Sequence, residues 1–414
     1  MKQLQTITWL STLTTLLLLT ACAVSAAPSR VEMINATREA RLQLALTPTV
    51  AGSESPVTPA DPSATAVTPL RVLVPTPALP INAPRLAPPT PLPNYQPAAQ
   101  RVELTGFNHE WQTWNNCGPA TLSMNLSYYG STLTQADIGG VLRTQEDDKN
   151  VMPEELVDFA RSQGYYGQMR VNGNADLMKL LLSNGVPVII ETWLEEEPND
   201  GMGHYRMLTG YDEAEQYWIG YDAYVDTGLF STWRTYRGIR MDYAQTEAWW
   251  SVFNHTYLLI YTEAQRPAVE SIFGVSLDAN AMWQEALTTA QQTVQAQPND
   301  AFAWFNLGSD LTVLGDYAGA AAAYDRARAI GLPWRMLWYQ FGPFEAYHAV
   351  GRYQDVVALA DATLVNTQSV EELHYWRGMG LAALGNVPAA QQAWQQALRL
   401  NPGYAPAQDA LSSR

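Results

Sequence analysis

The chain has few cysteines, histidines and basic residues. Its 414 residues include two cysteines and five histidines, and 24 Lys and Arg stand against 40 Asp and Glu, a net charge of -16. This charge repels phosphate backbones and anionic lipid surfaces, so we expect no nucleic-acid partner. The histidines are scattered, no HxxxH or CxxC spacing occurs, and no glycine-rich phosphate loop is present. We therefore expect no metal and no cofactor.

The first cysteine, Cys22, ends a short apolar segment near the N-terminus. The run WLSTLTTLLLLTA is too short to span a membrane and is followed by small residues. Its junction with Cys22 resembles the lipobox of bacterial lipoproteins, in which the cysteine is lipidated and becomes the mature N-terminus. We therefore expect residues 1–22 to be a lipoprotein signal peptide and the protein to be lipid-anchored in the cell envelope, on the outer side of the cytoplasmic membrane. The alternative is a secreted protein, cleaved near residues 24–26.

The remaining chain divides into three segments of different composition. Residues 23–100 are rich in Pro, Thr and Ala, which favours extended polyproline conformations and predicts a spacer. Residues 101–264 show helical periodicity first and strand-like runs afterwards, which predicts an α+β domain with N-terminal helices and an antiparallel sheet. Residues 267–414 are rich in Ala, Leu, Gln and Trp with helical periodicity throughout.

The C-terminal segment contains an internal repeat. Gly274, Gly308, Gly342 and Gly378 recur at intervals of 34, 34 and 36 residues, and phrases such as LGDYAGA and LGNVPAA recur with them. The pattern resembles the tetratricopeptide repeat, which stacks helix pairs into an all-α solenoid whose concave face docks peptides or proteins. We therefore expect a protein partner at residues 267–414, and we assign none of the repeat aromatics to a site.

Cys117 is the second cysteine, and an exported chain offers it no disulfide partner. It directly precedes the helix predicted for GPATLSMNLSYYG, which has Pro119 in its first turn and Gly130 at its end. Free amides at a helix N-terminus favour a thiolate and also face an oxyanion formed by its attack. The alternative is a buried structural thiol, because free cysteines are often small core residues.

A nucleophilic thiol needs a base, and three histidines lie outside the repeats. His109 belongs to the loop that enters the domain, and His255 lies near the last strand, in FNHTYLLIY. His204 begins the strand HYRMLTGY, beside Gly203. We expect His204 to be the base because it occupies a defined and accessible strand end.

The base in turn needs an orienting acid, and the hairpin after His204 offers one. If Asp212 pairs with Gln216 at the turn, Asp222 is the diagonal neighbour of His204 on the same face, about 7–8 Å away at the backbone. Asp212 itself would lie roughly 26 Å from His204 along the strand. Asp226 remains an alternative orienting acid if a bulge shifts the register, and a one-residue slip would turn the Asp222 side chain to the other face of the sheet.

Together these motifs resemble the peptidase C39-like group of papain-fold cysteine peptidases. The resemblance covers residues 101–264 through NNCGPATLSMNLSYYG, GHYRMLTGYD, GYDAY and SVFNHTYLLIY. It implies that Cys117 is the nucleophile, His204 the general base and Asp222 the orienting acid. It also implies that Gln112 supplies a side-chain donor to the oxyanion hole. Related exporter peptidases are fused to transporter domains, so we do not extend their cleavage of double-glycine leaders to this chain.

Three functions are compatible with these residues. The first is a cysteine peptidase that hydrolyses a peptide or protein substrate through a thioester, with the repeats recruiting protein. The second is an amidase or transpeptidase of the same fold that acts on cell-wall peptides. The third is a lipoprotein scaffold that binds peptide without catalysis.

Overall fold

The computed structural model describes residues 95–413, except residues 144, 146–149, 197–199 and 231–235. The predicted signal peptide, the predicted lipidation site Cys22 and the predicted spacer up to residue 94 lie outside the described residues. Within the described part of the chain, no helix has both the length and the apolar character needed to cross a membrane.

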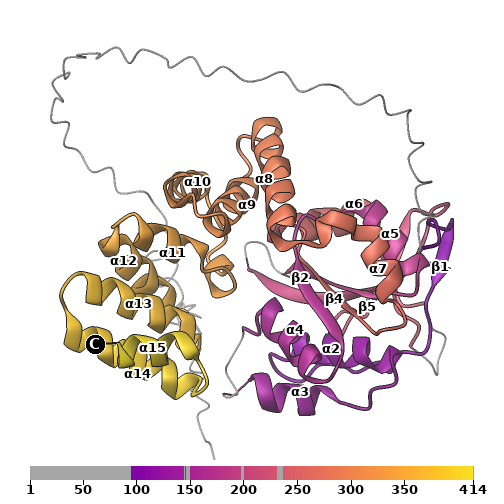
Figure 1. Cartoon of the computed structure of the whole chain (residues 1–414), viewed down its shortest axis with the longest axis horizontal. Coiled ribbons are helices and arrows are strands. Elements are labelled where there is room, and N and C mark those ends of the chain that lie inside the picture. The colour runs from indigo at the N-terminus through magenta and orange to yellow at the C-terminus, as the bar shows by residue number, and fades with distance from the viewer. Residues whose placement is uncertain (1–94, 144, 146–149, 197–199, 231–235, 414) are drawn as a thin grey trace, which may run out of the picture.

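An antiparallel sheet with helices on both faces forms the first half of the described chain (Figure 1). The strand order is β2-β7-β3-β4-β5-β6, and β1 pairs with the end of β4. The strands are β1 (Arg101–Glu103), β2 (Tyr166–Arg170), β3 (Val188–Glu195), β4 (Gly201–Asp212), β5 (Tyr217–Tyr221), β6 (Ile239–Asp242) and β7 (Tyr257–Tyr261). We call this part, from β1 to α7, the sheet domain.

Alternating strand residues pack against helices on the two faces of the sheet. The helices are α2 (Cys117–Tyr128), α3 (Gln135–Leu142), α4 (Pro153–Ser162), α5 (Ala175–Ser183), α6 (Tyr243–Trp250) and α7 (Arg266–Phe273). Ile189 packs with Leu122 of α2, whereas its neighbour Ile190 packs with Leu181 of α5. The predicted α+β class, with early helices and an antiparallel sheet, is confirmed. The order is more mixed than expected, because β2 lies between α4 and α5.

Local signals begin and end the helices that position the site. Pro153 occupies the first turn of α4, and the Glu155 carboxylate accepts a hydrogen bond from the Met152 amide at 2.8 Å. The Asn174 side chain caps α5 by accepting from the Leu177 amide at 3.0 Å. Gly130, just beyond α2, has a φ of 88° and therefore suits the left-handed turn that stops the helix.

Helices alone form the second half of the chain, which we call the helical region. They are α8 (Ala279–Ala296), α9 (Ala301–Val313), α10 (Tyr317–Ile330), α11 (Gly342–Ala349), α12 (Tyr353–Leu364), α13 (Glu371–Ala383), α14 (Val387–Leu400) and α15 (Ala405–Ser412). Gly308 of α9 packs against the Tyr324 ring of α10, and Gly378 of α13 packs against the Trp394 ring of α14. A Cβ atom at either glycine would overlap the ring, so both positions require glycine.

Two of the four glycines in the predicted repeat pattern do not occupy this packing position. Gly274 follows α7 as its C-cap, and Gly342 is the first residue of α11. The segment between α10 and α11 contains a 3₁₀ turn, η3 (Met336–Trp338), and this insertion moves the third helix pair out of the regular spacing. The interval of 34 residues at Gly342 is therefore not a structural repeat.

One hydrophobic cluster spans the two halves of the chain. Trp193 of β3 lies 6.0 Å from the Phe302 ring of α9, measured between centroids. The Asn254 side chain donates a hydrogen bond to the Asp310 carboxylate at 2.6 Å, and the Asn306 amide donates to the Ser251 carbonyl at 2.7 Å. The helical region is therefore packed directly on the sheet domain.

Gly201, at the start of β4, permits the Trp193 indole to lie across the strand. A Cβ atom at residue 201 would be 2.0 Å from the indole nitrogen, and the indole is held by Phe253 and Phe302. We expect Gly201→Ala to lower the free energy of unfolding by about 1–3 kcal/mol, measured by chemical denaturation. Gly140→Ala, in an open position of α3, should be neutral or stabilising by up to about 1 kcal/mol. Equal losses in both variants would contradict the proposed overlap.

Candidate active site

Cys117 is the first residue of α2 and is partly exposed. Asn115, two residues before Cys117, has a left-handed φ of 53°, and the intervening Asn116 forms no side-chain cap. The thiol therefore lies at a helix N-terminus whose first amides are not covered by a capping side chain. A cleft of about 490 Å³ borders Cys117, and Gln112 and His204 line the same cleft.

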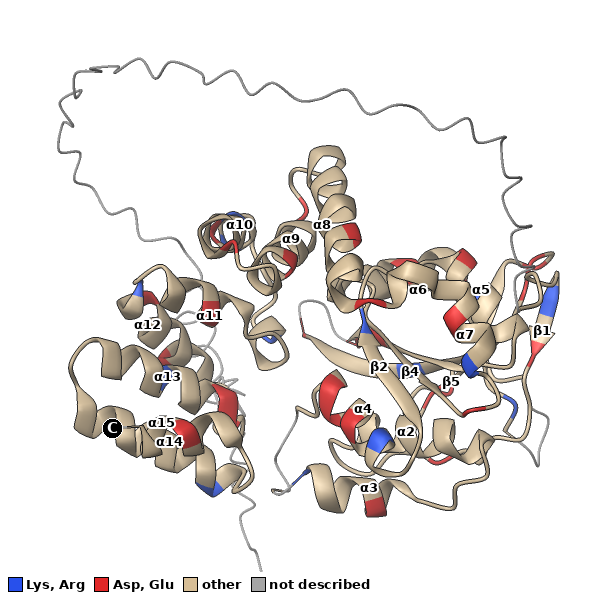
Figure 2. Ribbon diagram, viewed as in Figure 1, with Lys and Arg blue, Asp and Glu red and all other residues tan. Residues whose placement is uncertain are grey.

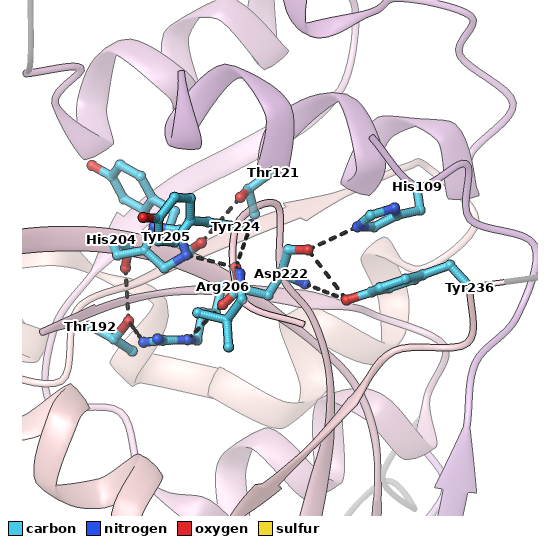
Figure 3. Close-up of polar contacts among 10 residues, drawn as sticks. His109, Thr121, Thr192, His204, Tyr205, Arg206, Asp222, Tyr224 and Tyr236 are labelled. Atoms are coloured by element: carbon cyan, nitrogen blue, oxygen red, sulfur yellow. Dashed lines mark hydrogen bonds and ion pairs between the residues drawn. The ribbon is translucent and has the colours of Figure 1, made fainter. Parts of the chain in front are cut away.

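Behind the cleft, His204 is paired with Asp222. The His204 Nε2 atom lies 2.9 Å from Asp222 Oδ1, and both side chains are buried (Figure 3). The amides of Tyr224 and Val225 each donate to the same Asp222 oxygen at 2.8 Å. Because Nε2 is engaged by Asp222, Nδ1 is the ring nitrogen left for Cys117. The structure thus brings together Cys117, His204 and Asp222, with Gln112 on the wall of the cleft.

The hairpin reaches this geometry through a register that differs from the expected one. Asp212 pairs with Tyr217 and not with Gln216, so the predicted turn pairing is wrong by one residue. A bulge between Leu208 and Gly210 then shifts the pairing by one residue, so that Leu208 pairs with Gly220, as the predicted register requires. Asp222 consequently faces His204 although the turn does not have the predicted pairing.

The charges at the site favour an ionised pair between the thiol and the imidazole. Burial raises the pKa of the Cys117 thiol, but the hydrogen bond and charge of His204, with the amides of Tyr205 and Gly118, outweigh burial and lower this pKa overall. Burial also disfavours the His204 imidazolium, but the Asp222 charge and its hydrogen bond raise the pKa of His204 to about 9. Both shifts favour a thiolate next to an imidazolium over the neutral pair.

Arg206, two residues after His204 on the same face of β4, holds the second oxygen of the Asp222 carboxylate. Its Nε donates to Asp222 Oδ2 at 2.9 Å, and another nitrogen donates to the Thr192 hydroxyl, which donates to the His204 carbonyl (Figure 3). The Trp249 ring lies under the guanidinium, 4.6 Å from its carbon. Arg206 was not among the predicted site residues, although the strand period of two places it beside His204.

We expect Arg206→Met to move the alkaline limb of the pH-rate profile upward. The Arg206 charge lowers the pKa of His204, so its removal raises this pKa above about 9, and the imidazolium persists to higher pH. The shift should be about one pH unit in a profile of kcat/KM. Arg237→Met, at an exposed arginine paired with Glu103, should leave the limb in place. An unchanged limb in both variants would show that Arg206 has only a structural role.

Two aromatic side chains hold the backbone of Asp222 from the other side. The His109 ring bonds the Asp222 carbonyl at 2.9 Å and stacks on Tyr236, with centroids 3.5 Å apart. The Tyr236 hydroxyl accepts from the Asp222 amide at 3.2 Å (Figure 3). His109 is therefore a structural neighbour of the acid, while His255 pairs with Glu247 at 2.7 Å in another part of the domain. His204 is the histidine that contacts the thiol.

A backbone hydrogen bond holds Gln112 at the cleft, and its side-chain oxygen has no hydrogen-bond partner among the described residues. The Gln112 backbone N–H donates to the Ala223 carbonyl at 2.8 Å, which places the loop beside the residue after Asp222. Its Oε1 atom is buried without a hydrogen-bond partner among the described residues. This oxygen can accept a hydrogen bond from a group that enters the cleft next to Cys117.

The helical region supplies one wall of the same cleft. Arg335, Trp338 and Tyr339, in and around η3, line it together with Cys117. Arg335 pairs with Asp200 at 2.6 Å, and the Tyr339 ring packs on Gly203, the residue before His204. The expectation that none of the repeat aromatics belongs to a site is corrected here, because Trp338 and Tyr339 line the cleft. The signal available was the aromatic-rich segment GLPWRMLWYQF, which interrupts the repeat pattern.

Comparisons with known proteins agree with this architecture. Residues 94–256 match the Peptidase_C39 like family, and residues 371–404 match the tetratricopeptide repeat. A search of curated proteins finds no match. Among solved structures, the chain is similar to a C39-like peptidase from Bacillus anthracis, at 15% identity and a TM-score of 0.31, over 40% of this chain and 98% of that one. It is also similar to the MamA RS-1 ArsTM double mutant, at 18% identity and a TM-score of 0.29, over 32% of this chain and 72% of that one. By the two family matches, the chain contains a Peptidase_C39-like domain followed by a tetratricopeptide repeat, which confirms the resemblance inferred from its motifs.

Proposed function

We propose that this protein is a cysteine peptidase that hydrolyses peptide bonds through a thioester intermediate. One observation carries the proposal: a partly exposed thiol at a helix N-terminus contacts His204, which is bonded to the buried Asp222. The lowered pKa of Cys117 and the raised pKa of His204 support the same assignment. A structural thiol in an apolar core would have neither property.

In the proposed reaction, the Cys117 thiolate attacks the carbonyl carbon of the scissile bond. The carbonyl oxygen becomes an oxyanion that accepts hydrogen bonds from an amide at the start of α2 and from the Gln112 side chain. The His204 imidazolium gives its proton to the amine, which leaves, and the acyl group remains on sulfur as a thioester. A water molecule, deprotonated by His204, then attacks the thioester and releases the acid, which restores the ionised pair.

The cleft and the N-terminal motif suggest the setting of this reaction. Trp114 and Tyr224 are exposed at the cleft, and the Glu196 carboxylate lies among its lining residues, whereas Asp200 is already paired with Arg335. We therefore infer a peptide with apolar side chains and a basic side chain near Glu196. We infer that the helical region docks a protein partner or the substrate itself. The lipobox-like motif at Cys22 supports export and a lipid anchor, and Cys22→Ser should release the protein from membranes.

Mass spectrometry of purified protein with a peptide library tests the proposed reaction. We expect peptide cleavage by the wild-type protein, an acyl adduct on Cys117 after acid quenching, and neither product with Cys117→Ala. Digestion of muropeptides with no cleavage of the library would favour the amidase or transpeptidase alternative. The peptidase assignment fails if the wild type and Cys117→Ala give the same products and no adduct forms.

A further inference from the structure

A second cavity, of about 240 Å³, lies where the sheet domain meets the helical region. Residues of α4, β2 and β3 line one side, and residues of α8, α9, α11 and α13 line the other. Tyr339 lines both this cavity and the catalytic cleft. The volume is a little below the ~300–1,000 Å³ of pockets for drug-sized ligands, which suits a single side chain or a small molecule.

A buried carboxylate without a partner lies on the wall of this cavity. Glu191, in the middle of β3, is only 3% exposed, and its Oε2 atom has no hydrogen-bond partner among the described residues. It pairs with Tyr205 in the ladder, so it lies on the face of the sheet that carries α2. Burial, and then the nearby charges of Glu154 and Cys117, raise the pKa of Glu191 well above its ordinary range. An unpaired buried carboxyl is costly, and a cation would relieve that cost.

The other lining residues of the cavity add negative charge and aromatic surface but no positive charge. Glu154, at the start of α4, and Glu345, on α11, are among them, and the residues that line the cavity include no Lys, Arg or His. Figure 2 shows the acidic start of α4 on the side of the sheet domain that faces the helical region. Trp283 and Trp376 contribute indole rings. Aromatic faces together with carboxylates are the groups that bind organic cations.

We propose that this cavity binds an organic monocation, an ammonium or guanidinium group on an apolar stem such as a lysine or arginine side chain carries. The cationic group would pair with the Glu191 carboxylate, and the apolar stem would lie against Trp283, Trp376 and Phe341. An inorganic divalent ion fits the site less well, because it requires several oxygen ligands together, and much of this wall is aromatic or apolar.

The site also lies next to the cleft that borders Cys117, since Tyr339 lines both spaces and its ring packs on Gly203. The ligand therefore comes from one of two sources: a basic side chain of a bound peptide, or a free small amine or guanidine. Both present the same chemistry to Glu191, and the experiment below distinguishes them.

Calorimetric titration of the full chain tests the proposal, in the Cys117→Ala background so that no peptide is consumed. We expect saturable binding of Ac-Gly-Arg-Gly-amide or n-butylguanidine, and affinity weaker by about 10- to 100-fold for the uncharged counterparts with citrulline or n-butylurea. If only the peptide binds, the ligand is a peptide side chain. If n-butylguanidine binds as well, a free small cation suffices. Equal affinity for charged and uncharged ligands would overturn the proposal, as would binding of Ca²⁺ or Mg²⁺ without binding of either guanidine.

Matched glutamate variants locate the binding. Glu191→Gln should weaken binding by about 10- to 100-fold, whereas Glu215→Gln, on the exposed β4–β5 turn, should not change it. Unchanged affinity in folded Glu191→Gln would overturn the assignment to this cavity. If Glu191→Gln does not fold, Glu345→Gln and the uncharged ligands carry the test. Because binding is measured without turnover, a failure of the peptidase proposal would leave this result intact.

Discussion

Replacing Asp222 by asparagine should lower kcat/KM by about 10⁴-fold. The groups that face this carboxylate are all donors: His204 Nε2, Arg206 Nε and the amides of Tyr224 and Val225. An asparagine side chain has one oxygen and must turn its NH₂ group toward one of these donors. If the NH₂ group faces His204, Nε2 loses its proton and Nδ1 carries it, so the imidazole can no longer serve Cys117 as a base.

The same substitution should lower the free energy of unfolding by about 3–5 kcal/mol. The Arg206 guanidinium is almost completely buried, and Asp222 is the carboxylate that balances its charge, so a neutral partner leaves it uncompensated. Steady-state kinetics at a temperature where the variant is folded, with chemical denaturation in parallel, separate the two effects. Asp226→Asn is the matched control, because Asp226 is exposed and was the alternative acid. If Asp222→Asn remained within tenfold of wild type while Asp226→Asn lost activity, the orienting acid would be Asp226.

The β4–β5 hairpin shows which part of the site could be predicted from the sequence. A strand period of two and an estimated turn position were enough to expect His204 and Asp222 on one face. They could not reveal the bulge between Leu208 and Gly210, which coincides with a contact outside the hairpin. A Cβ atom at Gly210 would be 2.3 Å from the Val102 carbonyl, so this glycine admits β1 to the edge of β4. The bulge thus accompanies a contact with a strand about one hundred residues earlier.

Helix prediction failed where the local signals were weak. The sequence QADIGGVL of α3 contains two adjacent glycines, which disfavour a helix, and α3 was not expected. Two other features stabilise it: the reciprocal cap between Thr134 and Asp137, and the close approach of Gly139 to the Asn116 side chain. The second feature depends on tertiary packing and therefore has no sequence pattern.

Contacts between the two halves of the chain could not be predicted from the sequence either. Arg335 and Tyr339 lie more than 130 residues from His204, and repeat periodicity assigns residues only to packing within a solenoid. The segment around η3 departs from that periodicity, and the structure places it on Gly203 at the cleft that borders Cys117. The sequence could indicate only that this aromatic-rich segment interrupts the repeat, and not which residues of the other domain it contacts.

Replacing His204 by alanine should raise the pKa of the Cys117 thiol and lower kcat/KM by about 10²–10⁴-fold. Burial is the largest influence on this thiol and acts to raise its pKa, and His204 provides the main opposing hydrogen bond and charge. Without His204, the amides of Tyr205 and Gly118 remain as the opposing groups. The midpoint of iodoacetamide alkylation against pH should then move upward, to about 8.5 or above, because only the thiolate reacts.

Alkylation needs no substrate, so this experiment tests the state of the thiol independently of what the cleft accepts. His255→Ala is the matched control, since His255 pairs with Glu247 away from the cleft and should leave both the midpoint and kcat/KM unchanged. An unchanged midpoint in His204→Ala would mean that the imidazole does not activate the thiol. Cys117 would then be an ordinary free cysteine, and the non-catalytic peptide-binding scaffold would become the better account of a domain that retains the peptidase fold.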